Sequence, residues 1–238
     1  MNEGTRGLPT IALRTRAPRQ GPELDLVNVV LRSGLPIKGR LQPVVFQEPE
    51  MPTGFPDIVA VYAARELPGW SDARLAFSNR HIRVLHHLYL SGGSSIAQLA
   101  EHLGSTGKHM RLLVDDLNNA CVVNLRGDYV TSRSLSRIFS ARRIVAIEAK
   151  IDDWRRAIEQ AIGNTWFASH SYILMPAHSR MKFVQEEARA FGVGVLIFNG
   201  EEAQVLLEAK ENPIPASYGS WLLNEWSVHR LRCGDGDD

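Results

Sequence analysis

The sequence predicts an α/β fold in which a mixed sheet flanked by helices is interrupted by a helical insert. Strand-like and helix-like segments alternate after residue 143, and two β-rich runs precede residue 63. The stretch 78–131 between them has apolar residues at helical spacing instead. The chain has 238 residues, 44% of them hydrophobic and 22% charged, as in a folded globular protein of one or two domains.

Hydrophobic period and turn residues predict the elements of the α/β part. A helix is expected over 23–31, where apolar positions recur at helical spacing before Gly34. The first two strands are expected at 44–46 and 58–62, separated by a segment rich in turn-forming residues. The later strands are expected at 144–150, 172–175, 193–198 and 203–207, and the later helices at 152–165, 180–191 and 221–226.

The insert has its own succession of elements. A helix with apolar positions from Ile82 to Leu90 ends at a Gly-Gly pair, and a second helix begins near Ser95. Ser105 or Thr106 can cap a third helix that reaches about Asn118. Two β-rich runs around residues 126–128 then predict a small hairpin.

Composition excludes several classes of protein. Cys121 and Cys233 belong to no zinc-ligand spacing and cannot form a disulfide scaffold. No apolar run reaches the roughly 20 residues that span a bilayer, and no apolar leader opens the chain, so we expect a cytoplasmic protein without a membrane partner. The net charge of +1 is uninformative, but arginines cluster without acids at 6–19 and 133–143.

One acid and one amine end the strand expected at 144–150. Because side chains two apart on a strand share a face, Glu148 and Lys150 should point the same way. Asp57 opens the strand at 58–62. A surface ion pair explains such residues without any chemistry. Alternatively, two carboxylates can hold a hard cation such as Mg²⁺ beside a phosphate, while an amine orients the attacking water.

Pro56-Asp57 followed downstream by Glu148-Ala149-Lys150 resembles the signature of the PD-(D/E)XK nucleases. The resemblance implies a restriction-endonuclease-like fold with Asp57 and Glu148 as ligands of Mg²⁺ or Mn²⁺ and Lys150 as a further catalytic residue. The gap between the two acids is longer than is common in this superfamily, and the helical insert accounts for the excess.

The segment after the motif resembles the helix of RecB-like members, in which a glutamine faces the site, and Gln160 matches that glutamine. The tyrosine expected four residues later is absent, since Asn164 stands there. A glutamate before the aspartate is also common in the superfamily. Glu48 and Glu23 are both candidates, and we prefer Glu48 as the additional metal ligand.

The insert resembles a winged helix-turn-helix domain, whose recognition helix enters the major groove of DNA by its N-terminal half. The resemblance implies that Lys108, His109 and Arg111 face DNA and that Arg126 lies at the wing. Asp115 and Asp116 make this surface unevenly charged. Winged helices also mediate protein contacts, and the sequence leaves this alternative open.

These observations predict a mobile basic arm over 1–22, a discontinuous nuclease-like core over 23–75 and 140–238, and a winged-helix insert over 76–139. The expected function is metal-dependent hydrolysis of DNA by an endonuclease, with DNA as partner and a homodimer left open. Two alternatives are a DNA-binding regulator that uses the nuclease fold as a silent scaffold and an interaction subunit of a nuclease complex.

Overall fold

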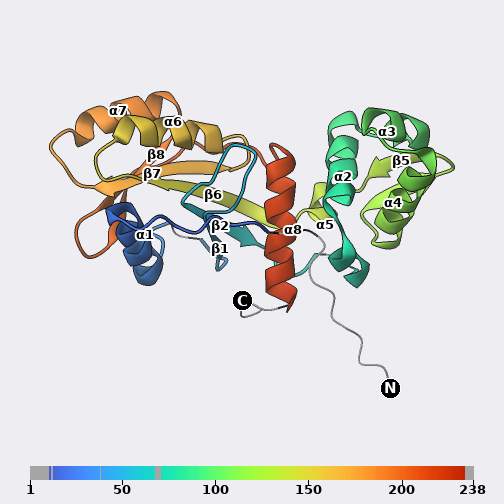
Figure 1. Cartoon of the computed structure of the whole chain (residues 1–238), viewed down its shortest axis with the longest axis horizontal. Coiled ribbons are helices and arrows are strands. Elements are labelled where there is room, and N and C mark those ends of the chain that lie inside the picture. The colour runs from blue at the N-terminus through green and yellow to red at the C-terminus, as the bar shows by residue number, and fades with distance from the viewer. Residues whose placement is uncertain (1–10, 12, 38, 68–70, 234–238) are drawn as a thin grey trace, which may run out of the picture. The chain divides into compact units, whose positions relative to one another are not determined.

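The computed structural model describes residues 11, 13–37, 39–67 and 71–233 (Figure 1). Its chain divides into two compact units. The sheet unit comprises Leu13–Ala63 and Ala141–Ser220. The helical unit comprises Ala64–Ser140 together with the residues from Trp221 onward and the first residues of the chain.

The sheet unit is built on a six-stranded mixed sheet, ordered β1-β2-β6-β7-β8-β9. β6, β7 and β8 are parallel to one another, and the other neighbours are antiparallel. This α/β architecture confirms the predicted mixed sheet flanked by helices. Its strands are β1 (Val44–Gln47), β2 (Ile58–Ala63), β6 (Ala141–Ala149), β7 (His170–Pro176), β8 (Gly194–Phe198) and β9 (Ala203–Leu207).

Helices cover both faces of this sheet (Figure 1). α1 (Pro22–Ser33) packs on the face that carries Val145, Ile147 and Ala149, which alternate along β6. α6 (Trp154–Asn164) and α7 (Met181–Ala190) pack on the opposite face. The sheet is therefore buried on both sides, which explains why β2 and residues 144–147 of β6 are wholly apolar.

The helical unit contains a three-stranded sheet ordered β3-β5-β4, against which helices pack. Met110, Leu113, Val114 and Leu117 form the buried face of α4. Of the two cap candidates, the Thr106 hydroxyl is the one that accepts the His109 N–H in its first turn. The elements are η1 (a 3₁₀ helix, Asp72–Ala76), α2 (Asn79–Ser91), β3 (Ser94–Ser95), α3 (Ile96–His102), α4 (Gly107–Asn119), β4 (Val123–Arg126), β5 (Tyr129–Ser132), α5 (Leu135–Ile138) and most of α8 (Tyr218–Cys233).

The predicted domain boundaries place residues 140–238 in one core, whereas the last helix is divided between the two units. From Trp221 onward α8 belongs to the helical unit. The Trp221 ring packs edge-on against Phe139, and the buried Glu225 pairs with Arg74. These long-range contacts involve polar and aromatic groups that no local period reveals.

The segment predicted as a mobile arm also differs in part. Residues 14–16 lie along residues 48–50, with a β-bridge between Thr15 and Pro49. The Arg16 N–H donates to the Glu48 carbonyl at 3.1 Å. The remainder of the arm up to residue 10 lies outside the described residues.

Ala63 and Ala141 are cross-strand partners in β2 and β6. The segment 64–140 therefore leaves and re-enters the sheet at adjacent points, as an inserted domain must. Among the described residues, no helix is both long enough and apolar enough to cross a membrane.

Candidate active site

Asp57 and Glu148 are neighbours at the end of two paired strands. β2 and β6 pair Ile58 with Ile147, so the next position along this ladder brings Asp57 opposite Glu148. The Ala149 N–H donates to Asp57 Oδ2 at 2.7 Å and ties the carboxylate to the end of β6. Two residues 91 positions apart in the sequence thus meet through strand pairing.

Glu148 is an acid in an unfavourable environment for its charge. It is 3% exposed, and Asn164 Nδ2 in α6 donates to its Oε1 at 2.7 Å. Burial, followed by the negative charge of Asp57, raises the pKa of Glu148 to about 8. The Asn164 hydrogen bond and the charge of Lys150 favour ionisation but do not offset the burial.

Burial also raises the pKa of Asp57, and the charges of Glu48 and Glu23 act in the same direction. The Ala149 N–H and the Lys150 charge oppose this increase. Two neighbouring carboxyl groups that both resist ionisation can be satisfied by a proton or by a bound cation.

Lys150 follows the strand rather than ending it, because β6 stops at Ala149. Its Nζ donates to Glu23 Oε2 in α1 at 3.0 Å and to the Ala149 carbonyl at 2.9 Å, and 12% of its side chain is exposed. The prediction that Glu148 and Lys150 share a face assumed a longer strand. Glu148 meets α6 and Lys150 meets α1, the helices that cover opposite faces.

Both candidates for the additional glutamate lie at this site, with different partners. Glu48 is buried, and its carboxylate is paired with the Arg16 guanidinium through Nε and Nη2. Its φ of 43° lies in the left-handed region that glutamate rarely adopts. Its N–H donates to the Asp57 carbonyl at 3.2 Å, while Glu23 holds Lys150. Unusual backbone of this kind is concentrated at functional sites.

Gln160 and Asn164 lie one turn apart on α6, and residues spaced by four share a helix face. The Gln160 Oε1 atom is buried and has no hydrogen-bond partner among the described residues. Asn164 departs from the subgroup's tyrosine, yet it contacts Glu148 directly. The four-residue spacing from Gln160 could have identified Asn164. Arg16 had no comparable sequence signal, because its contact depends on long-range pairing.

The donor set fits a hard divalent cation in part. Asp57 and Glu148 provide two carboxylates, to which water and phosphate oxygens can add the remaining ligands of Mg²⁺. Within the described ranges, however, no group of three or more His, Cys, Asp or Glu residues is arranged to hold a metal ion. The predicted third ligand, Glu48, is engaged by Arg16.

The predicted DNA-binding residues lie at the ends of α4 and β4, in the helical unit. Arg111 pairs with Asp128 at 2.8 Å and with Asp115 at 3.7 Å, so its charge is largely neutralised. His109 Nε2 accepts a hydrogen bond from Arg80 at 2.8 Å. Lys108 and Arg126 are exposed in the first turn of α4 and at the end of β4.

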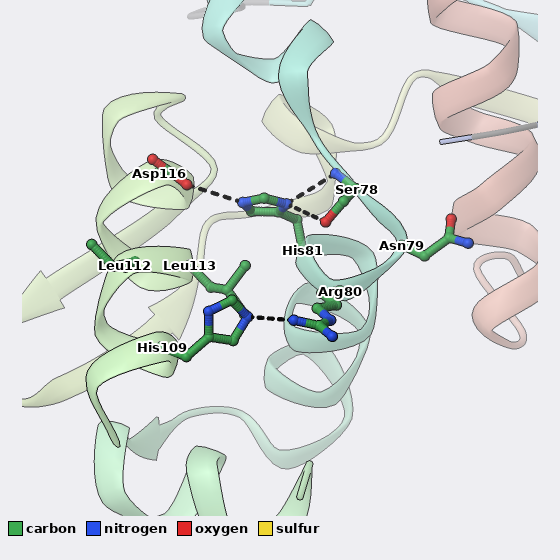
Figure 2. Close-up of a pocket in the computed structure, with 8 residues that line it drawn as sticks. All are labelled: Ser78, Asn79, Arg80, His81, His109, Leu112, Leu113 and Asp116. Carbon is green, nitrogen blue, oxygen red and sulfur yellow. Dashed lines mark hydrogen bonds and ion pairs between the residues drawn. The ribbon is translucent and has the colours of Figure 1, made fainter. Parts of the chain in front are cut away.

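A cavity of about 560 Å³ lies between α2 and α4 (Figure 2). His81 crosses it, with Nδ1 at 2.9 Å from the Ser78 N–H and from Ser78 Oγ, and Nε2 at 3.3 Å from Asp116. The serine, histidine and aspartate superficially resemble a hydrolytic triad. Because the backbone N–H donates to Nδ1, the ring instead caps α2 and ties it to α4. Burial lowers the pKa of His81 and favours this neutral ring.

The chain matches no protein-family model, no curated protein and no solved structure. The geometry of the Asp57–Glu148 site is therefore what indicates a function.

Proposed function

We propose that this chain is a divalent-metal-dependent DNA endonuclease of the PD-(D/E)XK type. The observation that carries the proposal is the placement of two like charges, Asp57 and Glu148, side by side in a largely buried position. Such an arrangement costs folding free energy, because burial disfavours each charge and the charges repel. A cation that binds both groups removes this cost, and its binding gives the arrangement a function.

Asp57 and Glu148 hold the cation in this proposal, and Mg²⁺ or Mn²⁺ when bound would neutralise charge on the scissile phosphate. Lys150 Nζ orients the attacking water or stabilises the charge of the phosphorane-like transition state. Glu23 positions the Lys150 amine, and Asn164 fixes the orientation of the Glu148 carboxylate. Gln160, whose Oε1 has no partner in the part of the chain that the structure describes, lies one turn from Asn164 and adds a polar group on the same helix face.

The mixed sheet with α1 on one face and α6 on the other supports the proposed superfamily. The order of helices and strands from α2 to β5 supports a winged helix in the insert, with α4 as the recognition helix. Lys108 and Arg126 are its best phosphate-contacting candidates, because both are exposed cations.

A DNA-binding regulator built on a silent nuclease fold is the second candidate. The Arg16–Glu48 pair favours it, since this pair occupies a carboxylate that a metal site could use. An interaction subunit of a nuclease complex would show the same features with weaker binding to DNA.

A cleavage assay separates these candidates. Supercoiled plasmid and single-stranded DNA should be cut by the wild-type chain with Mg²⁺ or Mn²⁺ and remain uncut with EDTA. Glu148→Ala and Lys150→Ala should abolish cutting. Glu186→Ala and Lys182→Ala, which remove an exposed acid and an exposed amine from α7, should not. Binding without cutting on every substrate would favour the regulator.

A further inference from the structure

We propose that Arg16 is the phosphate-binding residue of the candidate active site, and that its ligand is a phosphodiester of the nucleic acid backbone. This inference rests on the proposed function and adds a contact that the motif does not contain. Its evidence is the position of the arginine, its partners and the charge balance around it.

The backbone of Arg16 is fixed beside the site. The Arg16 N–H donates to the Glu48 carbonyl at 3.1 Å, and the Glu50 N–H donates to the Arg14 carbonyl at 2.8 Å. Arg16 is therefore attached to the segment that connects β1 to Asp57. A side chain on such a support starts from a defined position, which reduces the entropy lost when it binds a ligand.

The guanidinium is oriented as well as positioned. Nε and Nη2 bind the Glu48 carboxylate, and the group stacks over the Phe55 ring at 5.1 Å from its centroid. The side chain is nevertheless 41% exposed. A guanidinium has five N–H donors in a planar fork, so one edge can stay on a carboxylate while another donates to a phosphate oxygen.

The charge balance of the site requires such a group. Four acids lie close together here: Glu23, Glu48, Asp57 and Glu148. The charges of Glu23 and Glu48 raise the pKa of Asp57, and the charge of Asp57 raises the pKa of Glu148. Lys150 is one cation, and Glu23 already holds it. Among the residues that the structure describes, Arg16 is the other cation whose charge lowers the pKa of Glu148. A phosphodiester adds a further negative charge, so Arg16 is suited to compensate it.

A double-mutant cycle in the full chain tests the proposal without requiring cleavage. The variants are wild type, Glu48→Gln, Arg16→Gln and the combination, with Arg19→Gln as the matched control for losing one exposed arginine. Affinity for a fluorescein-labelled 20-mer, single-stranded and duplex, is measured in EDTA over a range of salt. Melting temperature and far-UV circular dichroism check that each variant is folded.

Glu48→Gln releases the guanidinium and should raise affinity about tenfold, as expected for a charge-assisted hydrogen bond. It should also steepen the slope of log affinity against log salt concentration by about one, as expected for one additional phosphate contact. Both changes should vanish when Glu48→Gln is placed in the Arg16→Gln background, while Arg19→Gln should leave the gain intact. Arg16→Lys should retain part of the gain, because it keeps the charge but loses the fork.

An equal gain from Glu48→Gln with and without Arg16 would overturn the proposal, because the gain would then come only from relief of carboxylate repulsion. Absence of any gain would overturn it too. If Arg16→Gln does not fold, the comparison of Arg16→Lys with its Glu48→Gln combination decides by the same criterion. All binding is measured without metal, so the nuclease proposal can fail separately. In that case the double-mutant cycle would show the coupling between Arg16 and Glu48, but the chain would not cut DNA with Mg²⁺ or Mn²⁺.

Discussion

Both units bury ionisable side chains, but the neighbours of these side chains differ. One unit pairs an acid with a base, and the other places two acids side by side. In the helical unit, Arg74 and Glu225 are nearly inaccessible and form an ion pair, and Arg74 also donates to the Ile138 carbonyl at 2.6 Å. In the sheet unit, Asp57 and Glu148 place two carboxyl groups at neighbouring positions, and burial raises the pKa of both. Buried opposite charges that are fully hydrogen-bonded can be purely structural, whereas two neighbouring buried carboxyl groups must take up a proton or bind a cation. Pairing, rather than burial itself, distinguishes the candidate active site.

The largest expected effect is on chemistry at the like-charge pair. Asp57→Ala, Glu148→Ala and Lys150→Ala should each reduce DNA cleavage by about a thousandfold or more, because each removes a group that acts on the transition state. DNA affinity in Ca²⁺ should remain near the wild-type value for Lys150→Ala and should not fall for the two acid replacements. Cleavage retained by Glu148→Ala would end the nuclease interpretation.

The opposite-charge pair should respond in stability instead. Glu225→Gln leaves the Arg74 guanidinium buried without its counter-charge and should lower the free energy of unfolding by about 3–5 kcal/mol. Chemical denaturation followed by circular dichroism measures this loss. Cleavage by the fraction that remains folded should be unchanged, and a stability equal to wild type would show that Arg74 is compensated by its other contacts.

The raised pKa of Glu148 should make the stability of the fold depend on pH. Because the folded-state pKa of Glu148 is about 8, above its value of 4.5 in an unfolded chain, its contribution to stability is fully present below pH 4.5. It decreases as the pH rises through 8, by an amount on the order of a few kcal/mol. Glu148→Gln cannot ionise, so it should be more stable than wild type at pH 8.5 and show a flatter profile. A wild-type profile unchanged by this replacement would contradict the raised pKa.

A smaller effect is expected from the residues that orient Glu148. Asn164→Ala removes a hydrogen bond to the ionised carboxylate and should weaken Mn²⁺ binding about tenfold to a hundredfold, with the loss greatest at lower pH. Gln160→Ala should weaken Mn²⁺ binding by an amount at the lower end of this range, because the Gln160 Oε1 atom has no hydrogen-bond partner among the described residues. Isothermal titration calorimetry at pH 6.5 and 8.5 measures both, and equal Mn²⁺ affinities for wild type and Asn164→Ala would remove Asn164 from the site.

The smallest effect is expected at the exposed surface of the helical unit. Lys108→Glu and Arg126→Glu should each reduce the salt slope of DNA binding by about one. Arg111→Glu should change it less, because Asp128 and Asp115 already neutralise Arg111. Fluorescence anisotropy at several salt concentrations gives these slopes. A larger change for Arg111→Glu than for Lys108→Glu would show that its ion pairs open when DNA binds.

The sequence by itself determined the elements of the fold and most members of the site. Hydrophobic period is a local property, so it located the strands, α1, α4 and α6 to within a few residues. The motif also identified Asp57, Glu148 and Lys150, whose types and spacing are visible in the chain. Period alone still misleads at some positions, since Leu90 continues the apolar spacing of α2 yet is 67% exposed.

Only the tertiary structure decided which charges meet. It joined Arg16 to Glu48 and Arg74 to Glu225 through contacts across 32 and 151 positions. It also ended β6 at Ala149, which turned Lys150 toward Glu23 in α1 instead of keeping it on the face of Glu148. The physical reason is that burial and electrostatic neighbours, which set the pKa of Glu148 and the partner of each arginine, depend on residues distant in sequence.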